Sequence, residues 1–70
     1  MDAKLKAILA NWRDLNESLH ELNEDQVRMM LDWELEHEWR VTVVERLHQR
    51  YNALRVKRER EELMARNKGG

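Results

Sequence analysis

The chain has 70 residues, with no cysteine, no proline and a formal net charge of −1. This length allows one domain with a small core, and the lack of cysteine excludes a disulfide framework and a cysteine-based zinc site. No apolar run approaches the roughly 20 residues that span a bilayer, and the first residues do not resemble a secretion signal. We therefore expect a cytoplasmic protein that does not enter a membrane.

The small net charge conceals an uneven distribution along the chain. Residues 1–39 carry four basic and ten acidic side chains, a net charge of −6. Residues 40–70 carry nine basic and four acidic side chains, a net charge of +5. Either the two parts pair with each other, or the second part displays a basic surface to a partner.

The composition predicts an all-α fold. The only two glycines occupy the last two positions, and Ala, Leu, Glu, Lys and Arg favour helices throughout. We expect three helices, at about residues 3–20, 24–37 and 43–66, arranged as a helical hairpin or a three-helix bundle. Residues 1–66 would form a single domain, followed by a flexible tail at residues 67–70.

The first predicted helix has the clearest pattern. Its apolar side chains are Leu5, Ile8, Trp12, Leu15, Leu19 and Leu22, with Leu9 widening the stripe. Their spacing of three and four residues places them on one face of a helix. The pattern predicts a continuous helix that ends at about residue 20.

The second helix has a clear start and a less clear end. Asn23 can cap a helix that begins near residue 24, and Gln26 can complete a capping box. Thr42 and Glu45 form a second capping-box pattern, so we place a turn at about residues 38–42. One continuous helix through this region is the alternative, because neither glycine nor proline interrupts it.

The third predicted helix is too long for a compact core. At about 1.5 Å per residue it extends for about 36 Å, against about 21 Å for the second helix. Its last turns, at residues 58–62, would extend beyond the core, where they are solvated or pack on a second subunit. Because small domains without disulfides or metals often oligomerise, a homodimer is expected.

Four basic side chains form a narrow stripe on the third helix, away from its apolar face: Arg46, Arg50, Lys57 and Arg60. We interpret them as partner-binding residues. The partner would be an acidic protein surface or DNA, since Arg46, Gln49 and Arg50 can read base edges in the major groove. The simpler alternative is that these side chains pair with the acidic first and second helices, or with Glu45 and Glu59 nearby.

A second candidate surface lies on the second helix. Met29 and Trp33 are positioned away from its inner apolar face. Both residue types are favoured at interfaces, methionine for its adaptability and tryptophan for its area. We interpret this pair as a docking or dimer surface, with burial between neighbouring helices as the alternative.

Glu34 and Glu38 point the other way, into the apolar sector of the second helix. A buried carboxylate is costly unless a basic group pairs with it. Arg58 lies in the apolar sector of the third helix, so we expect a structural ion pair between Arg58 and Glu34 or Glu38.

No arrangement of residues predicts catalysis or a cofactor. Each histidine follows a glutamate by three residues, which is the ligand spacing of di-iron bundles. The pairs are Glu17/His20, Glu34/His37 and Glu45/His48. Only Glu34 points inward, so we interpret the pairs as chance and expect no metal. With no nucleophile arrangement and no glycine-rich phosphate loop, we expect that the protein is not an enzyme.

The run Arg-Leu-His-Gln-Arg-Tyr at residues 46–51 and the run Arg-Glu-Arg at residues 58–60 belong to a longer segment, from Leu22 to about Leu63. This segment resembles short all-helical proteins of unassigned function that tailed bacteriophages encode. The resemblance implies a phage protein that acts in the host cytoplasm. We therefore expect a non-catalytic protein-binding module that modulates a host or phage protein. The alternative is a small DNA-binding transcriptional regulator that uses helix 43–66.

Overall fold

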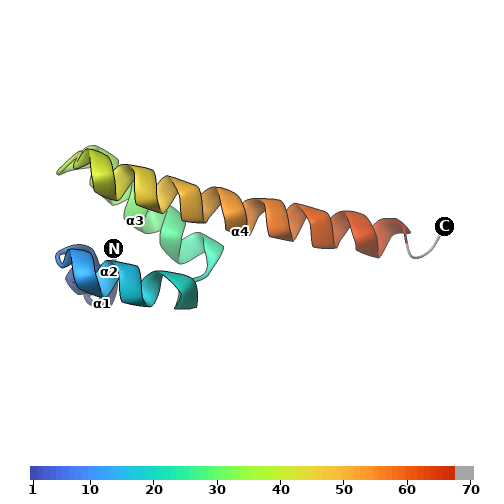
Figure 1. Ribbon diagram of the computed structural model, residues 1–70, viewed down its shortest axis with the longest axis horizontal. Coiled ribbons are helices and arrows are strands. Elements are labelled where there is room, and N and C mark those ends of the chain that lie inside the picture. Colours follow the sequence, from blue (N-terminus) through green and yellow to red (C-terminus); the bar gives the residue numbers. More distant parts are fainter. Residues whose placement is uncertain (68–70) are drawn as a thin grey trace.

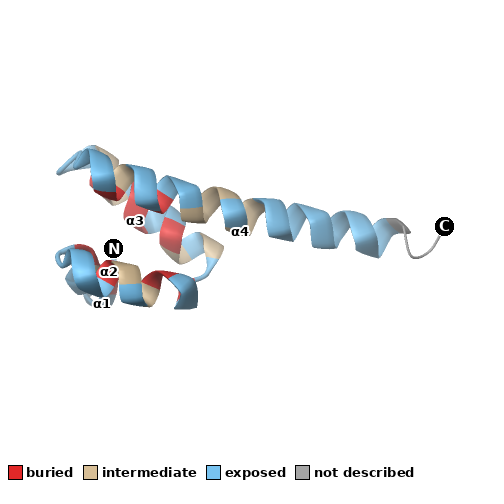
Figure 2. Ribbon diagram, viewed as in Figure 1, coloured by how far each residue is buried: buried red, intermediate tan, exposed pale blue. Residues whose placement is uncertain are grey.

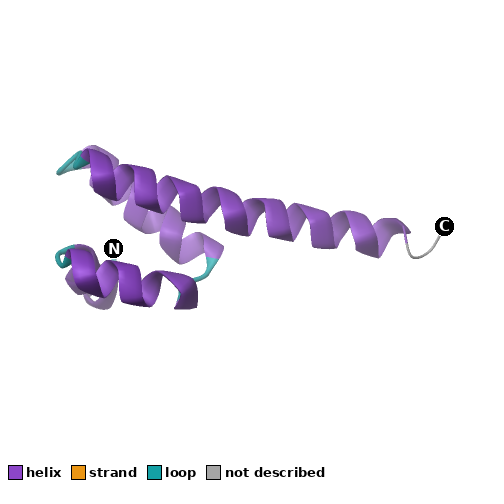
Figure 3. Cartoon of the chain, viewed as in Figure 1, coloured by secondary structure: helices purple, strands orange, loops and turns teal. Residues whose placement is uncertain are grey.

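The computed structural model describes residues 1–67, and all regular secondary structure in this part of the chain is helical (Figure 1, Figure 3). The predicted all-α class is confirmed, but residues 1–67 form four α-helices instead of three, together with one short 3-10 helix. In chain order they are α1 (Ala3–Leu9), α2 (Trp12–Ser18), η1 (Leu19–Glu21), α3 (Glu24–Glu36) and α4 (Val41–Asn67). None of the described helices has the length and apolar character that crossing a membrane requires.

The first predicted helix is interrupted, so the expectation of one helix over residues 3–20 is wrong. Asn11 has an extended backbone, and its side-chain oxygen accepts hydrogen bonds from the N–H groups of Arg13 and Asp14. This capping satisfies N–H groups that have no partner within the helix and starts a new helix. The break also leaves Trp12 half exposed, although its spacing had placed it in the apolar stripe.

The predicted start of α3 is confirmed. The Gln26 N–H donates to the Asn23 side chain at 2.8 Å, and the Asn23 N–H donates to the Gln26 side chain at 3.0 Å, which completes the capping box. The helix ends at Glu36, one residue before the predicted end. A turn follows, and α4 begins at Val41. Thr42 therefore lies inside the first turn of α4 and does not cap it.

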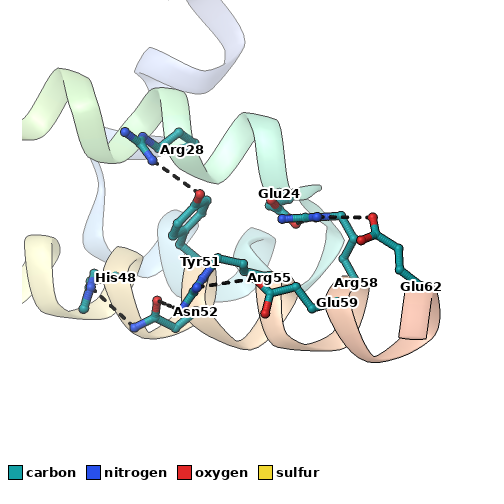
Figure 4. A network of polar contacts seen from close by, with 9 residues as sticks. All are labelled: Glu24, Arg28, His48, Tyr51, Asn52, Arg55, Arg58, Glu59 and Glu62. Carbon is teal, nitrogen blue, oxygen red and sulfur yellow. Dashed lines mark hydrogen bonds and ion pairs between the residues drawn. The ribbon is translucent and has the colours of Figure 1, made fainter. Parts of the chain in front are cut away.

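α3 and α4 lie side by side and run antiparallel (Figure 1). Arg28 of α3 donates from Nη1 to the Tyr51 hydroxyl of α4 at 3.3 Å. Glu24, which is earlier in α3, accepts from Arg58, which is later in α4, at 2.8 Å. Figure 4 shows both contacts. They hold the middle of α4 against the first turns of α3.

The core lies between the first half of α4 and the other helices (Figure 2). Its ten buried apolar side chains come from every helix and from the loop before α3: Leu5, Leu9, Leu15, Leu19, Leu22, Val27, Met30, Leu31, Val43 and Leu47. Each short N-terminal helix thus contributes to one shared core instead of forming its own.

Every residue of α4 from Val56 to Arg66 is exposed. This segment, residues 56–66, is called the outer part of α4 below, and it makes the molecule elongated, with extents of 47 × 19 × 19 Å (Figure 2). The prediction that the last turns of the helix extend beyond the core is confirmed. Asn67 is still helical, so the predicted tail at residues 67–70 does not begin there, and residues 68–70 lie outside the described part of the chain.

The turn between α3 and α4 contains a strained residue. Trp39 has a φ of 52°, the left-handed region that favours glycine. Its N–H donates to the Glu34 carbonyl at 2.8 Å, which ties the turn back to α3. The Trp39 side chain is 59% exposed, so burial of the indole contributes little to offset this strain.

We predict that Trp39→Gly stabilises the fold by about 1 kcal/mol, because glycine adopts the left-handed conformation without a steric penalty. Trp39→Ala is the matched control, since it also removes the indole but keeps the Cβ atom that causes the strain. Urea unfolding should give a higher midpoint for the glycine variant than for the alanine variant. Equal midpoints would show that the left-handed backbone conformation of Trp39 does not reduce the stability of the fold.

Candidate partner-binding surfaces

The buried carboxylate of Glu34 is bound by Arg40. The Glu34 side chain is 0% exposed and that of Arg40 is 40% exposed. Arg40 donates from Nη2 to Oε1 at 2.8 Å, and from both Nε and its backbone N–H to Oε2 at 2.9 Å. Nη2 also donates to the Leu9 carbonyl at 3.3 Å. Arg40 therefore connects the end of α1, the interior of α3 and the start of α4.

These hydrogen bonds hold the pKa of Glu34 below its ordinary value. The side-chain hydrogen bonds from Arg40 are the largest cause, and they outweigh burial, which by itself raises the pKa of a carboxyl group. The backbone N–H and the positive charge of Arg40 lower it further. In return, the hydrogen bond to Glu34 raises the pKa of the Arg40 guanidinium. Glu34 is thus a charged structural residue at neutral pH.

The predicted ion pair between Arg58 and Glu34 or Glu38 is wrong. Arg58 donates from Nε to Glu24 at 2.8 Å and from Nη1 to Glu62 at 3.2 Å (Figure 4). The hydrogen bond to Glu24 is the main reason that the Arg58 pKa is raised. Glu38 lies in the turn, is exposed, and forms no ion pair within residues 1–67.

Trp33 is shared by two open clefts on the α1 and α3 side of the molecule. The larger, of about 490 Å³, is lined by Lys6, Ala7, Leu9, Ala10, Trp33, Glu38 and Arg40. The smaller, of about 230 Å³, is lined by Met1, Met29, Asp32, Trp33 and Glu36. We call the two clefts together the Trp33 groove. The sequence-predicted pair, Met29 and Trp33, therefore lies on one surface.

The Trp33 ring is held in place on both sides. It stacks on the His37 ring with 4.3 Å between centroids and an angle of 10°. The His37 Nδ1 atom lies 2.8 Å from the Trp33 carbonyl oxygen, which fixes the stacked imidazole. Lys6 Nζ of α1 lies 5.9 Å from the indole centroid, within range of a cation–π contact. Trp33 is half-buried and forms a wall of both clefts, whereas Met29 beside it is 48% exposed.

The predicted basic stripe does not form one solvent-facing surface. Arg46 of α4 donates from Nε to the Asn16 side chain of α2 at 3.0 Å. Arg50 donates from Nη2 to the His20 carbonyl of η1 at 3.2 Å. The stripe's first half therefore packs against the N-terminal helices through neutral groups and not through carboxylates. Lys57 and Arg60 lie on the outer part of α4, where both are exposed.

The histidines do not gather into a metal site. Within residues 1–67 no three histidine, aspartate or glutamate side chains are arranged to hold a metal ion. His37 stacks on Trp33, and the His48 Nε2 atom lies 3.4 Å from the Asn52 amide (Figure 4).

Three important residues were not identified from the sequence. Arg40 and Trp39 lie in the α3–α4 turn, where helical spacing gives no information, and Met1 precedes α1. One signal could have indicated Arg40: it is the basic residue closest to Glu34 across a short turn, so it can reach back when that turn is tight.

Comparisons of the chain with protein-family models, with curated proteins and with solved structures found no match.

Proposed function

We propose that the chain is a non-catalytic protein-binding module that docks its partner in the Trp33 groove. The observation that carries this proposal is that one tryptophan, stacked on His37, forms a wall of two adjacent open clefts beside an exposed methionine. Aromatic and methionine side chains around a concavity are typical of interface centres. As the resemblance to short phage proteins implies, the partner would be a host or phage protein whose activity is modulated by binding.

The rim of the groove indicates the chemistry of the partner segment. Glu36 and Glu38 contribute acidic groups, and the Arg40 charge is already neutralised by Glu34. Lys6 is the remaining basic residue of the lining and lies over the Trp33 ring. An apolar side chain flanked by basic residues would therefore complement the groove best.

The alternative, a DNA-binding regulator, has less support. Base reading would require Arg46, Gln49 and Arg50 to face the major groove together. In the structure these three residues line a cleft against α2 and η1, and both arginines donate hydrogen bonds to those helices. Because both arginines are bound to α2 and η1, their guanidinium groups are not placed to reach base edges together.

The outer part of α4 supports the homodimer expected from the sequence. Val56 and Leu63 are seven residues apart, which places them on the same helix face, and Met64 adjoins them. All three are more than half exposed. A second copy would bury these apolar side chains.

Met29→Glu tests the proposed docking surface. The substitution adds a charge to the groove on an exposed helix position, so the helix content should be unchanged while capture of the partner from bacterial lysate is lost. Gln49→Glu is the matched control, because it adds the same charge to α4, outside the groove. A partner captured equally by both variants would contradict docking at the Trp33 groove.

A further inference from the structure

A second cleft, of about 280 Å³, lies where α4 crosses α2 and η1. It is lined by Asn16, Leu19, His20, Arg46, Gln49, Arg50 and Ala53. Two arginines, one histidine and two amides thus converge, and no carboxylate lines the cleft. The charged side chains of the lining are therefore basic, and the Glu21 carboxylate lies just outside it, 3.9 Å from His20 Nε2. The cleft shares no lining residue with the Trp33 groove, so an anion bound here would not occupy the proposed docking surface.

Four of the nine arginines form no ion pair within residues 1–67: Arg46 and Arg50 in this cleft, and Arg60 and Arg66 on the exposed outer part of α4. Five arginines form ion pairs with carboxylates: Arg13, Arg28, Arg40, Arg55 and Arg58. Within residues 1–67, Arg46 and Arg50 form none, although they are one helical turn apart and repel each other. Each is instead fixed by a neutral acceptor, the Asn16 side chain for Arg46 and the His20 carbonyl for Arg50.

The Arg50 guanidinium also has a hydrogen-bond donor without an acceptor. Its Nε atom is buried and has no hydrogen-bond partner among the described residues. A buried donor without an acceptor costs free energy. Nε has almost no exposed surface in this conformation, so an oxyanion in the cleft would supply the acceptor once the side chain turns its Nε–H outward. Oxyanions bind Nε together with a terminal nitrogen in a fork.

We propose that this cleft is an anion site that binds a phosphate monoester group through Arg46 and Arg50. Asn16 and the His20 carbonyl hold the two guanidinium groups in place before the ligand arrives, which lowers the entropic cost of binding. Gln49 adds a neutral amide donor to the same wall.

Charge and donor number favour a phosphate monoester over a carboxylate. Two arginines supply a charge of +2, which a monoester matches, since it carries about −1.5 to −2 at neutral pH. Two guanidinium forks also offer more N–H donors than one carboxylate can accept, and arginine is the preferred residue for such planar recognition of phosphate.

The test follows the arginine Nε–H signals of the full chain by NMR during titration with inorganic phosphate. The Arg46 and Arg50 signals should shift and saturate, whereas sodium chloride at the same ionic strength should leave them unsaturated. Arg13 is the internal reference, because it pairs with Glu17 on the exposed face of α2. If the Arg50 and Arg13 signals responded alike to both salts, the proposed anion site would be wrong.

Gln49→Glu tests the cleft without removing either arginine contact. The added carboxylate would occupy or repel the anion site and should weaken phosphate binding roughly tenfold or more. Met29→Glu, which adds the same charge in the Trp33 groove, should leave phosphate binding unchanged. Equal phosphate affinity in the two variants would overturn the proposal, whatever the pull-down shows for the partner.

Ribose 5-phosphate distinguishes the two sources of the group. Tighter binding than that of inorganic phosphate would identify a phosphorylated small molecule as the ligand, and weaker binding would identify the free ion. Either result supports the site, provided that Gln49→Glu weakens it. The third ligand is a short single-stranded oligonucleotide without terminal phosphates. If the protein bound it more tightly than either of the other two, the ligand would not be a phosphate monoester.

Discussion

Arg40→Ala should lower the free energy of unfolding by about 3 kcal/mol, because it leaves a buried carboxylate without its partner. Glu34 accepts three hydrogen bonds from Arg40 and has no exposed surface of its own. The backbone hydrogen bond can persist in the variant, but the two from the guanidinium cannot. In a domain of this size, whose total stability is about 5 kcal/mol, this loss makes folding marginal.

Chemical unfolding followed by circular dichroism measures this loss, and Arg13→Ala is the matched control. Arg13 also forms an ion pair with a glutamate, Glu17, but both side chains are largely exposed. Exposed pairs of this kind contribute less than about 0.5 kcal/mol. If the two alanine variants were equally stable, the buried pair would have no special role in the fold.

The pH dependence gives a second measure of the same pair. In the wild type the Glu34 pKa is lowered by Arg40, from an ordinary value of 4.5. A carboxyl group whose pKa is lower in the folded state contributes stability above its unfolded pKa and loses it as the pH falls through the folded value. Stability should therefore decrease on acidification below about pH 4.5. In Arg40→Ala, burial raises the Glu34 pKa, so the difference in stability between wild type and variant should shrink in acid.

The helix content could be predicted from the sequence, whereas the break in the first helix could not. Spacing of apolar residues reports which face of a helix is buried, and it describes Leu5 and Leu9 as well as Leu15 and Leu19 correctly. It does not report where a polar side chain ends one helix and caps the next. Asn11 is a preferred N-cap residue that is also tolerated inside helices, so only the competition between capping and continuation makes it a boundary.

The partner of Glu34 was missed for a related reason. Helical projection compares positions on regular helices, so it indicated Arg58, which shares the inner sector of α4. Arg40 lies in an irregular turn whose geometry depends on the left-handed Trp39. Because such a backbone conformation is unfavourable for tryptophan, no local preference predicts it. The burial of Glu34, in contrast, was correctly inferred from its place in the apolar sector of α3.

The orientation of the basic stripe depended on the same break. Had the first helix been continuous, its direction across α4 would have been different. With α2 and η1 turned by the break, Asn16 and His20 lie beside Arg46 and Arg50. The neighbours of these basic side chains could not be deduced from a single helix at a time.

Leu47→Ala should destabilise the fold by about 3 kcal/mol, whereas Leu63→Ala should change it by less than about 0.5 kcal/mol. Leu47 is fully buried in the core between α4 and the other helices, and Leu63 lies 64% exposed on the outer part of the same helix. The two substitutions have the same effect on helix propensity. The difference between them therefore isolates the contribution of core packing.

Urea unfolding of both variants at low micromolar concentration gives this difference, and repeating it at high concentration tests the outer part of α4. If a second copy covers Leu63, the alanine variant loses stability only where the wild type is dimeric, because association stabilises the folded state by mass action. Leu47→Ala removes contacts within one chain, so the loss of unfolding free energy that it causes should be the same at both protein concentrations. A large, concentration-independent loss at Leu63 would mean that the outer part of α4 packs against its own chain, contrary to the exposed segment that the structure shows.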